Sequence, residues 1–307
     1  MPKTTNQVIC KLPKAGLGNQ LFPLLKGYVF ARLNHLPILV VGFNYLKIGP
    51  YLRKEKSKRN YHQYFIFQKN TLQNFINNIK IGLNKGKKWI NEPILTHLNS
   101  NTRSHLFIFS EIPHWSDSFA ELKDHLITVR SILYQILNPI VLAEMNAQKK
   151  PVVGVHIRMG DFKKLQQGES FENIGGVRTP EEYFIDIINR IREVNGSLLP
   201  VSIFTDGYKD ELQGIMKLSN IEIIEGNRDI VDLLLLSKSQ IIVTSAGSSF
   251  SYWAGFLSDA PIIIHPDHVH ETIRPTNIGR EYFEGPFDEN SILLVKQIRS
   301  IQIPIYD

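Results

Sequence analysis

The fold is decided by residues 152–161, whose sequence is VVGVHIRMGD. Residues 152–157 are almost wholly apolar, which is typical of a strand buried on both faces of a parallel sheet. On such an extended segment His156 and Arg158 point to the same side, so an imidazole and a guanidinium emerge together where the strand ends. Gly160 and Asp161 follow and complete a polar turn. This order predicts a polar site at the carboxyl end of a parallel strand.

The second half of the chain continues as alternating strands and helices. Thr179 and Pro180 predict a helix start, with Thr179 as the cap and Glu182 completing a capping box. Apolar runs predict further strands at 201–205, 221–224, 241–244 and 262–264, and helices at 209–218, 229–237 and 249–257. Such alternation implies a parallel sheet with right-handed crossovers, which is a doubly wound α/β domain.

The first half shows the same alternation less regularly. We expect strands at 7–12, 37–41 and 106–109, and helices at 21–29, 72–79, 119–133 and 140–148. The polar break at 149–151, Lys-Lys-Pro, indicates a hinge. The expected fold is therefore GT-B-like, with two Rossmann-like doubly wound domains, 1–150 and 151–307, facing each other across a cleft.

Composition sets limits on partners and compartment. The chain has 307 residues, 43% of them hydrophobic, a net charge of +6 and one cysteine, Cys10, which we expect to be a buried spectator. No apolar run approaches the roughly 18 residues that span a bilayer, so we expect a cytoplasmic protein. The basic residues cluster in 47–88, which predicts either a solvated face or peripheral contact with the inner face of an anionic membrane. No nucleic-acid motif accompanies this charge, and no such partner is expected.

The first glycine turn, residues 14–21 with the sequence KAGLGNQL, lies between a predicted strand and a predicted helix. It has two glycines of a dinucleotide fingerprint, but Leu21 stands where the third belongs, so a nicotinamide cofactor is not expected. The amides of Asn19 and Gln20 at the mouth of the helix can bind sugar hydroxyls or phosphate. The alternative is a tight turn with a structural role only.

Residues 245–251, SAGSSFS, also lie between a predicted strand and a predicted helix. Small residues let the backbone approach an anion closely, and the first N–H groups of the helix supply donors. The pattern is neither a serine-hydrolase elbow nor a phosphate-binding P-loop. An anion-binding loop is the favoured interpretation, and simple helix capping is the alternative.

Two charged residues extend this picture. Arg158 can bind a diphosphate with two N–H groups and stay charged while a leaving group departs. Asp161 is expected to orient Arg158 or cap the turn, and the alternative is a buried structural ion pair. Asp232 precedes four leucines, so its carboxylate needs a dedicated partner, for which the adjacent N–H donors of guanine are suited. Neither an Asp-x-Asp motif nor a His/Cys cluster with metal spacing occurs, so no metal is expected.

Together these motifs resemble the fucosyltransferases that share a His-x-Arg-x-Gly-Asp motif, most closely the bacterial α-1,2-fucosyltransferases of glycosyltransferase family 11. The resemblance lies in three ordered segments, 16–22, 156–161 and 232–253. It implies a GT-B fold, GDP-fucose bound mainly by the second domain, and neither metal nor other cofactor. It also implies an inverting transfer of L-fucose to a hydroxyl of an oligosaccharide acceptor, with α-1,2 as the expected linkage.

The same resemblance assigns roles to individual residues. Arg158 would bind the GDP phosphates, Asp232 would read guanine, and Gly18 and Asn19 would face the fucose and the acceptor. The expected catalytic set is His156, Arg158, Asn19 and Asp161. The residues expected to bind the donor are Gly18, Asn19, His156, Arg158, Asp206, Asp232, Ser248, Ser249 and Phe250.

Some features leave alternatives open. The family usually has Trp-Trp where Tyr252-Trp253 stands. The general base is not fixed, with Asp161, Glu172 and Asp206 as candidates. Transfer of another GDP-deoxyhexose, a different fucosyl linkage, and a nucleotide- or glycan-binding module without catalysis are the alternative functions. In each transferase reading Arg158 would face a solvent-filled cleft in the free enzyme.

Overall fold

The computed structural model describes residues 6–303 apart from 44–47, 53, 57, 60, 62, 68–86, 100–103, 165, 167, 170–175, 269 and 277–280. The chain forms two compact units. Unit 1 is Met1–Lys47 with Arg59–Leu142, and unit 2 is Ile48–Lys58 with Ala143–Asp307. The main division therefore falls inside α5 (Pro139–Asn146), before the polar break at 149–151.

Unit 2 is built on a six-stranded, wholly parallel sheet in the order β10-β9-β8-β5-β6-β7. Read from β7, this is the strand order 3-2-1-4-5-6 of a Rossmann fold, with its switch point between β5 and β8. The strands are β5 (Val153–Ile157), β6 (Val201–Thr205), β7 (Ile221–Ile223), β8 (Ile241–Val243), β9 (Ile262–Ile263) and β10 (Glu284–Gly285).

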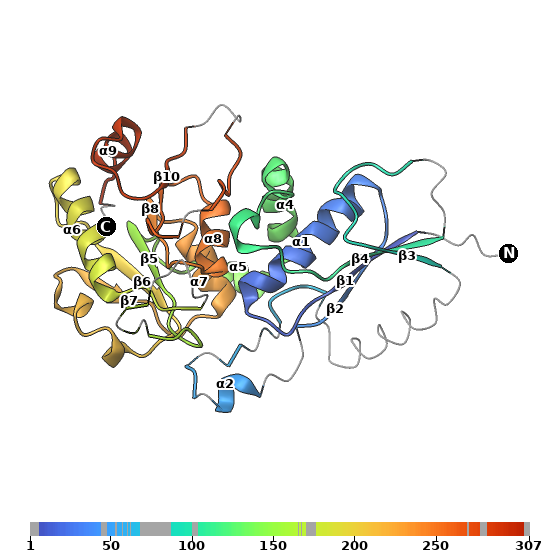
Figure 1. The fold of residues 1–307 in the computed structure, drawn as a ribbon, viewed down its shortest axis with the longest axis horizontal. Coiled ribbons are helices and arrows are strands. Elements are labelled where there is room, and N and C mark those ends of the chain that lie inside the picture. Colours follow the sequence, from blue (N-terminus) through green and yellow to red (C-terminus); the bar gives the residue numbers. More distant parts are fainter. Residues whose placement is uncertain are drawn as a thin grey trace. The chain divides into compact units, whose positions relative to one another are not determined.

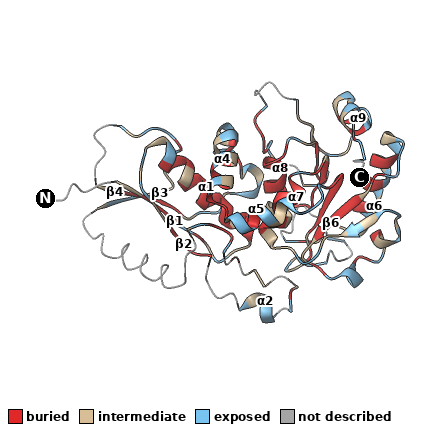
Figure 2. Cartoon of the chain, turned by 180° about the vertical axis from the view of Figure 1, so that it is seen from behind, coloured by how far each residue is buried: buried red, intermediate tan, exposed pale blue. Residues whose placement is uncertain are grey.

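Helices cover both faces of this sheet. Figure 1 shows α6 (Glu181–Asn195) and α9 (Ile292–Arg299) on one face, and α7 (Asp229–Leu236) and α8 (Ser249–Phe256) on the other. All five residues of β5 are buried, as a strand covered on both sides must be, and β6 is likewise mostly buried (Figure 2). The apolar run at 152–157 thus contains one of the two central strands of the sheet.

Unit 1 has a smaller parallel sheet in the order β2-β1-β4-β3. Its elements are β1 (Gln7–Lys11), α1 (Leu17–Leu33), β2 (Ile38–Val41), β3 (Lys88–Asn91), β4 (His105–Phe109) and α4 (Leu126–Ile136). Cys10 is fully buried between β1 and α1, where burial raises the pKa of its thiol, so it is the spectator that the sequence predicts. The predicted α/β class, with two parallel-sheet units, is confirmed.

Several predicted elements differ in the structure. The helix predicted at 209–218 is two short 3-10 turns, Lys209–Glu211 and Ile215–Lys217, and the helix predicted from 119 begins only at Leu126. Strands β3 and β10 and helix α9 were not predicted. The helix predicted at 72–79 lies outside the described residues.

The predicted capping box at α6 is wrong. The helix begins at Glu181 with Pro180 in the cap position, and no side chain caps it. The Thr179 hydroxyl accepts a hydrogen bond from Ala246 N instead, at 3.0 Å. A side chain that sequence assigns to a local cap is thus used to hold a loop that is distant in the sequence.

Candidate functional site

The His-x-Arg segment and the 245–251 loop meet where β5 and β8 end. One hydroxyl joins the two strand ends: Ser245 Oγ donates to His156 O at 2.8 Å and accepts from Arg158 N at 2.8 Å. Ser245 is fully buried, so this bridge is shielded from water. The His-x-Arg segment and the 245–251 loop are therefore fixed against each other at the switch point, where ligands of such sheets bind.

Arg158 is held by two carboxylates. Its Nη1 donates to Asp206 Oδ2 at 2.5 Å and its Nη2 donates to Asp161 Oδ1 at 2.6 Å. The side chain is 19% exposed and its guanidinium lies 5.3 Å from the centre of the Phe162 ring. Arg158 is therefore paired with carboxylates, as in the ion-pair alternative, and its side chain is only partly exposed.

These pairs leave part of the guanidinium open. A guanidinium carries five N–H donors, and two of them are used by Asp206 and Asp161. Among the described residues, the remaining donors have no hydrogen-bond acceptor, so they can still bind an anion. One arginine and two aspartates give Arg158, Asp161 and Asp206 a formal net charge of about −1. An anion bound here therefore needs further donors.

Asp206 anchors the turn that carries Arg158. Its Oδ1 accepts from Met159 N at 2.8 Å while its Oδ2 pairs with Arg158. A Cβ at Gly160 would lie 2.2 Å from Asp206 Oδ2, so the glycine of the motif is needed for this close approach. Asp206, which was predicted to bind the donor, therefore fixes the direction of the Arg158 side chain.

His156 contributes an uncharged ring. It is 4% exposed and its imidazole stacks on Phe250, with ring centres 4.9 Å apart. Burial, with the nearby Arg158 charge, lowers the pKa of His156 to about 3, so the ring is neutral at neutral pH. Its Nδ1 is buried and has no hydrogen-bond partner among the described residues.

The 245–251 loop presents the start of α8. Three successive loop amides already have acceptors: Ala246 N donates to Thr179 Oγ1, Gly247 N to the Tyr252 hydroxyl and Ser248 N to Ser245 O. The next three, at 249–251, open the helix and have no acceptor among the described residues, and no side chain caps α8. The start of α8 at 249–251 is therefore a place where an anion can bind, and it includes Ser249 and Phe250 of the predicted donor-binding set. Ser248, also predicted, precedes this group, and its amide is already bonded to Ser245 O.

Asp232 lies in the first turn of α7, where Asn227 Nδ2 donates to its Oδ1 at 3.0 Å. Burial is the main cause that raises its pKa to about 7, with Asp229 adding to the shift and Lys56 opposing it. The sequence did not indicate Asn227 or Lys56, since neither lies in a recognisable motif. Asp232 is thus poised between its protonated and ionised forms near neutral pH.

The other predicted site residues lie in unit 1 or outside the described residues. Gly18 and Asn19 lie in the first turn of α1 in unit 1, so their predicted role in the same site stays a prediction. The neighbouring Gln20 holds that turn, because its Nε2 donates to Pro13 O at 2.7 Å and to Ala15 O at 3.1 Å. Glu172 lies outside the described residues, as does most of the basic stretch 47–88.

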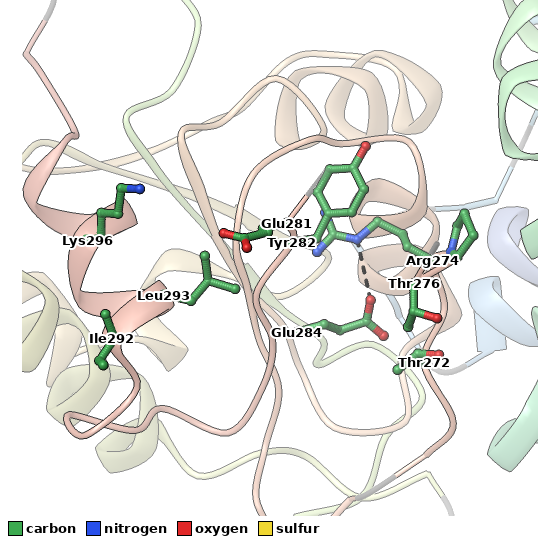
Figure 3. Close-up of a pocket in the computed structure, with 10 residues that line it drawn as sticks. Thr272, Arg274, Thr276, Glu281, Tyr282, Glu284, Ile292, Leu293 and Lys296 are labelled. Atoms are coloured by element: carbon green, nitrogen blue, oxygen red, sulfur yellow. Dashed lines mark hydrogen bonds and ion pairs between the residues drawn. The ribbon is translucent and has the colours of Figure 1, made fainter. Parts of the chain in front are cut away.

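A separate pocket of about 500 Å³ lies between α9 and the segments around 274 and 282 (Figure 3). None of the predicted site residues lines it. Its buried Arg274 is already committed, donating to Glu284 and to the carbonyl oxygens of Ser258, Ala260 and Phe283. This arginine has a structural role, in contrast with the partly open guanidinium of Arg158.

The described residues contain no group of three His, Cys, Asp or Glu side chains arranged to hold a metal ion. None of their helices combines the length and the apolar character that a membrane span requires.

We expect Asp232→Asn to stabilise the protein at pH 8 and to have little effect at pH 4. The raised pKa means that the folded state binds the Asp232 proton more tightly than the unfolded chain, so ionisation of Asp232 opposes folding increasingly as the pH rises from about 4 to about 7. Asparagine removes this charge and keeps an acceptor for Asn227. Melting temperatures of both proteins across this range measure the effect, and parallel curves would contradict it.

Comparison with solved structures finds similar chains of low sequence identity. NodZ from Bradyrhizobium, a fucosyltransferase, is 12% identical, with a TM-score of 0.49 over 86% of this chain and 98% of that one. An Arabidopsis thaliana FUT1 mutant in complex with GDP is 12% identical, with a TM-score of 0.45 over 89% and 76%. POFUT1 in complex with GDP-fucose is 14% identical, with a TM-score of 0.45 over 92% and 98%. No curated protein sequence matches the chain.

The family model described as Glycosyl transferase family 11 matches residues 66–268, about two thirds of the chain. The matched range includes the end of β5, the first turn of α7 and the loop before α8, and it excludes Gly18 and Asn19. The resemblance drawn from the sequence motifs is confirmed by this match, and so is the predicted class of enzyme, a glycosyltransferase. The chain belongs to glycosyl transferase family 11.

Proposed function

We propose that the protein transfers L-fucose from GDP-fucose to a hydroxyl of an oligosaccharide, with inversion at the fucose carbon and an α-1,2 linkage. One observation carries the proposal. The open edge of the Arg158 guanidinium and the free amide groups of α8 belong to neighbouring strand ends that Ser245 ties together. This pairing suits a diphosphate, and family membership makes a nucleotide sugar its natural source.

In this proposal the bond between the fucose carbon and the GDP oxygen breaks as the acceptor oxygen attacks from the other side. Arg158 and the amides at 249–251 stabilise the negative charge that develops on the departing diphosphate. His156 and Phe250 form a flat, uncharged wall beside it. Ionised Asp232 accepts hydrogen bonds from the two adjacent N–H donors of guanine.

The acceptor proton needs a base, and the candidates among the described residues differ in their exposure. Asp206 receives hydrogen bonds from Arg158 and Met159 N, and its side chain is 15% exposed. Asp161 also pairs with Arg158, but its side chain is 34% exposed. An acceptor can reach Asp161 more easily, so Asp161 is the favoured base, and it must lie within about 3 Å of the acceptor oxygen, directly or through one water.

A panel of nucleotide sugars tests the function itself. Purified protein with an oligosaccharide mixture is expected to transfer fucose from GDP-fucose and to leave UDP-sugars unused. The product linkage follows from analysis of the fucosylated oligosaccharide. Transfer from another GDP-deoxyhexose alone would correct the sugar, whereas GDP binding with neither transfer nor donor hydrolysis would indicate a binding module. Activity with a UDP-sugar and none with GDP-fucose would refute the proposal.

Replacing Arg158 with lysine keeps the charge but removes the planar fork that binds two oxygens at once. We expect transfer at saturating GDP-fucose to fall by about 100-fold, in the range found when one transition-state donor is lost. Part-exposed ion pairs contribute little to stability, so the melting temperature should fall by only about 2–4 °C.

Arg190→Lys is the matched control for this variant. Arg190 also pairs with two carboxylates in unit 2, Glu289 and Asp186, but it lies on the exposed side of α6. Its replacement should leave transfer unchanged. If Arg158→Lys instead unfolds well below the wild type and transfers at a normal rate when folded, Arg158 has a structural role only.

We also expect transfer to survive excess EDTA, because Arg158 and the amides of α8 supply the positive potential that a divalent cation would otherwise provide. Initial rates with EDTA, with Mg²⁺ and with Mn²⁺ should agree within about twofold. A large loss in EDTA that either ion restores would show that the phosphates are neutralised by a metal.

A further inference from the structure

The 245–251 loop is held from behind by a buried tyrosine. Tyr252, on the first turn of α8, is 3% exposed, and its hydroxyl accepts a hydrogen bond from Gly247 N at 3.0 Å. Gly247 has a φ of +67°, a conformation that favours glycine, so the direction of its amide depends on this bend. The hydroxyl thus holds the bend of the loop at Gly247.

A histidine orients that hydroxyl. His268 Nδ1 lies 3.1 Å from the Tyr252 oxygen. Burial and the neighbouring His270 lower the pKa of His268 to about 4, so its ring is neutral and has an acceptor nitrogen. The phenol oxygen accepts from Gly247 N–H, and the phenol proton can be donated to His268 Nδ1. Gly247, Tyr252 and His268 are therefore linked in one hydrogen-bonded series.

The same histidine restricts the loop by contact. A Cβ placed on Gly247 would lie 3.3 Å from His268 Nε2, so the imidazole packs directly against the bend. The Tyr252 ring in turn lies against His270, with ring centres 4.5 Å apart. Four residues outside the predicted catalytic set, Gly247, Tyr252, His268 and His270, therefore meet where the loop turns into α8.

We propose that Tyr252 and His268 are positioning residues that hold the 245–251 loop in the shape in which the free amides of α8 bind the donor diphosphate. This inference rests on the proposed function. We assign neither side chain a contact with the donor, since Tyr252 is buried and its hydroxyl is bonded to Gly247 N and His268 Nδ1. Their effect is therefore on the affinity for the diphosphate and not on the chemical step.

Tyr252→Phe is the direct test, because it removes one oxygen and leaves the ring. Gly247 N–H then loses its acceptor and the bend loses its fixed direction. We expect GDP to bind about 10-fold more weakly by calorimetry, which corresponds to the loss of one buried hydrogen bond. The KM for GDP-fucose should rise similarly, while kcat at saturating donor stays within about twofold.

Tyr183→Phe is the matched control. Tyr183 is partly buried in unit 2, and its buried hydroxyl has no hydrogen-bond partner among the described residues. Its removal should leave GDP binding unchanged. A purely structural role for Tyr252 would lower the melting temperature and leave the KM alone, so the two readouts separate the two roles.

Variants at position 268 keep the test decisive if Tyr252→Phe folds poorly. His268→Gln offers an amide oxygen as acceptor and should retain most of the GDP affinity, whereas His268→Leu offers none and should match Tyr252→Phe. Wild-type affinity in Tyr252→Phe, or equal affinity in the two His268 variants, would overturn the inference alone. A wild-type protein that binds no GDP would overturn it together with the proposed function.

Discussion

The bridge made by Ser245 is the interaction on which the rest of the site depends. Adjacent parallel strands whose crossovers run in opposite directions leave an opening at their carboxyl ends, and backbone groups there lack strand partners. Ser245 satisfies one carbonyl and one amide of the β5 end at once, at His156 and Arg158. The direction of the arginine and the path of the loop into α8 are thereby set by a single buried hydroxyl.

The charges around this bridge are arranged unevenly. Arg158 carries the one cation of the described group, and Asp161 and Asp206 more than balance it. Carboxylates that hold a guanidinium in place also repel a phosphate, so the arginine alone is a weak anion site. The uncapped amides of α8 supply a second source of positive potential without a compensating acid. A diphosphate, with its two charged groups, can use both sources at once.

Sequence reasoning located the strands and the chemistry better than the turns. Apolar runs such as 152–157 and 241–244 have few alternatives to a buried strand, and the motifs that follow them are local in sequence. The failures involve partners distant along the chain. Thr179 has the pattern of a helix cap but binds Ala246, and 209–218 has a helical stripe but forms 3-10 turns. The sequence marks Tyr252 only as a departure from the family's usual Trp-Trp pair and gives no sign of its bond to Gly247 N.

Burial gives the site a common electrostatic character. It keeps His156 and His268 neutral and raises the pKa of Asp232 to about 7, so these two imidazoles add no positive charge to the site near neutral pH. The field on a bound anion then comes largely from N–H groups whose directions the fold fixes. Salt would screen lysines on the surface, and their side chains could move. Backbone N–H groups at a helix start are held in place and are screened less. Affinity here depends on backbone direction, which is why residues behind the loop are as important as those facing it.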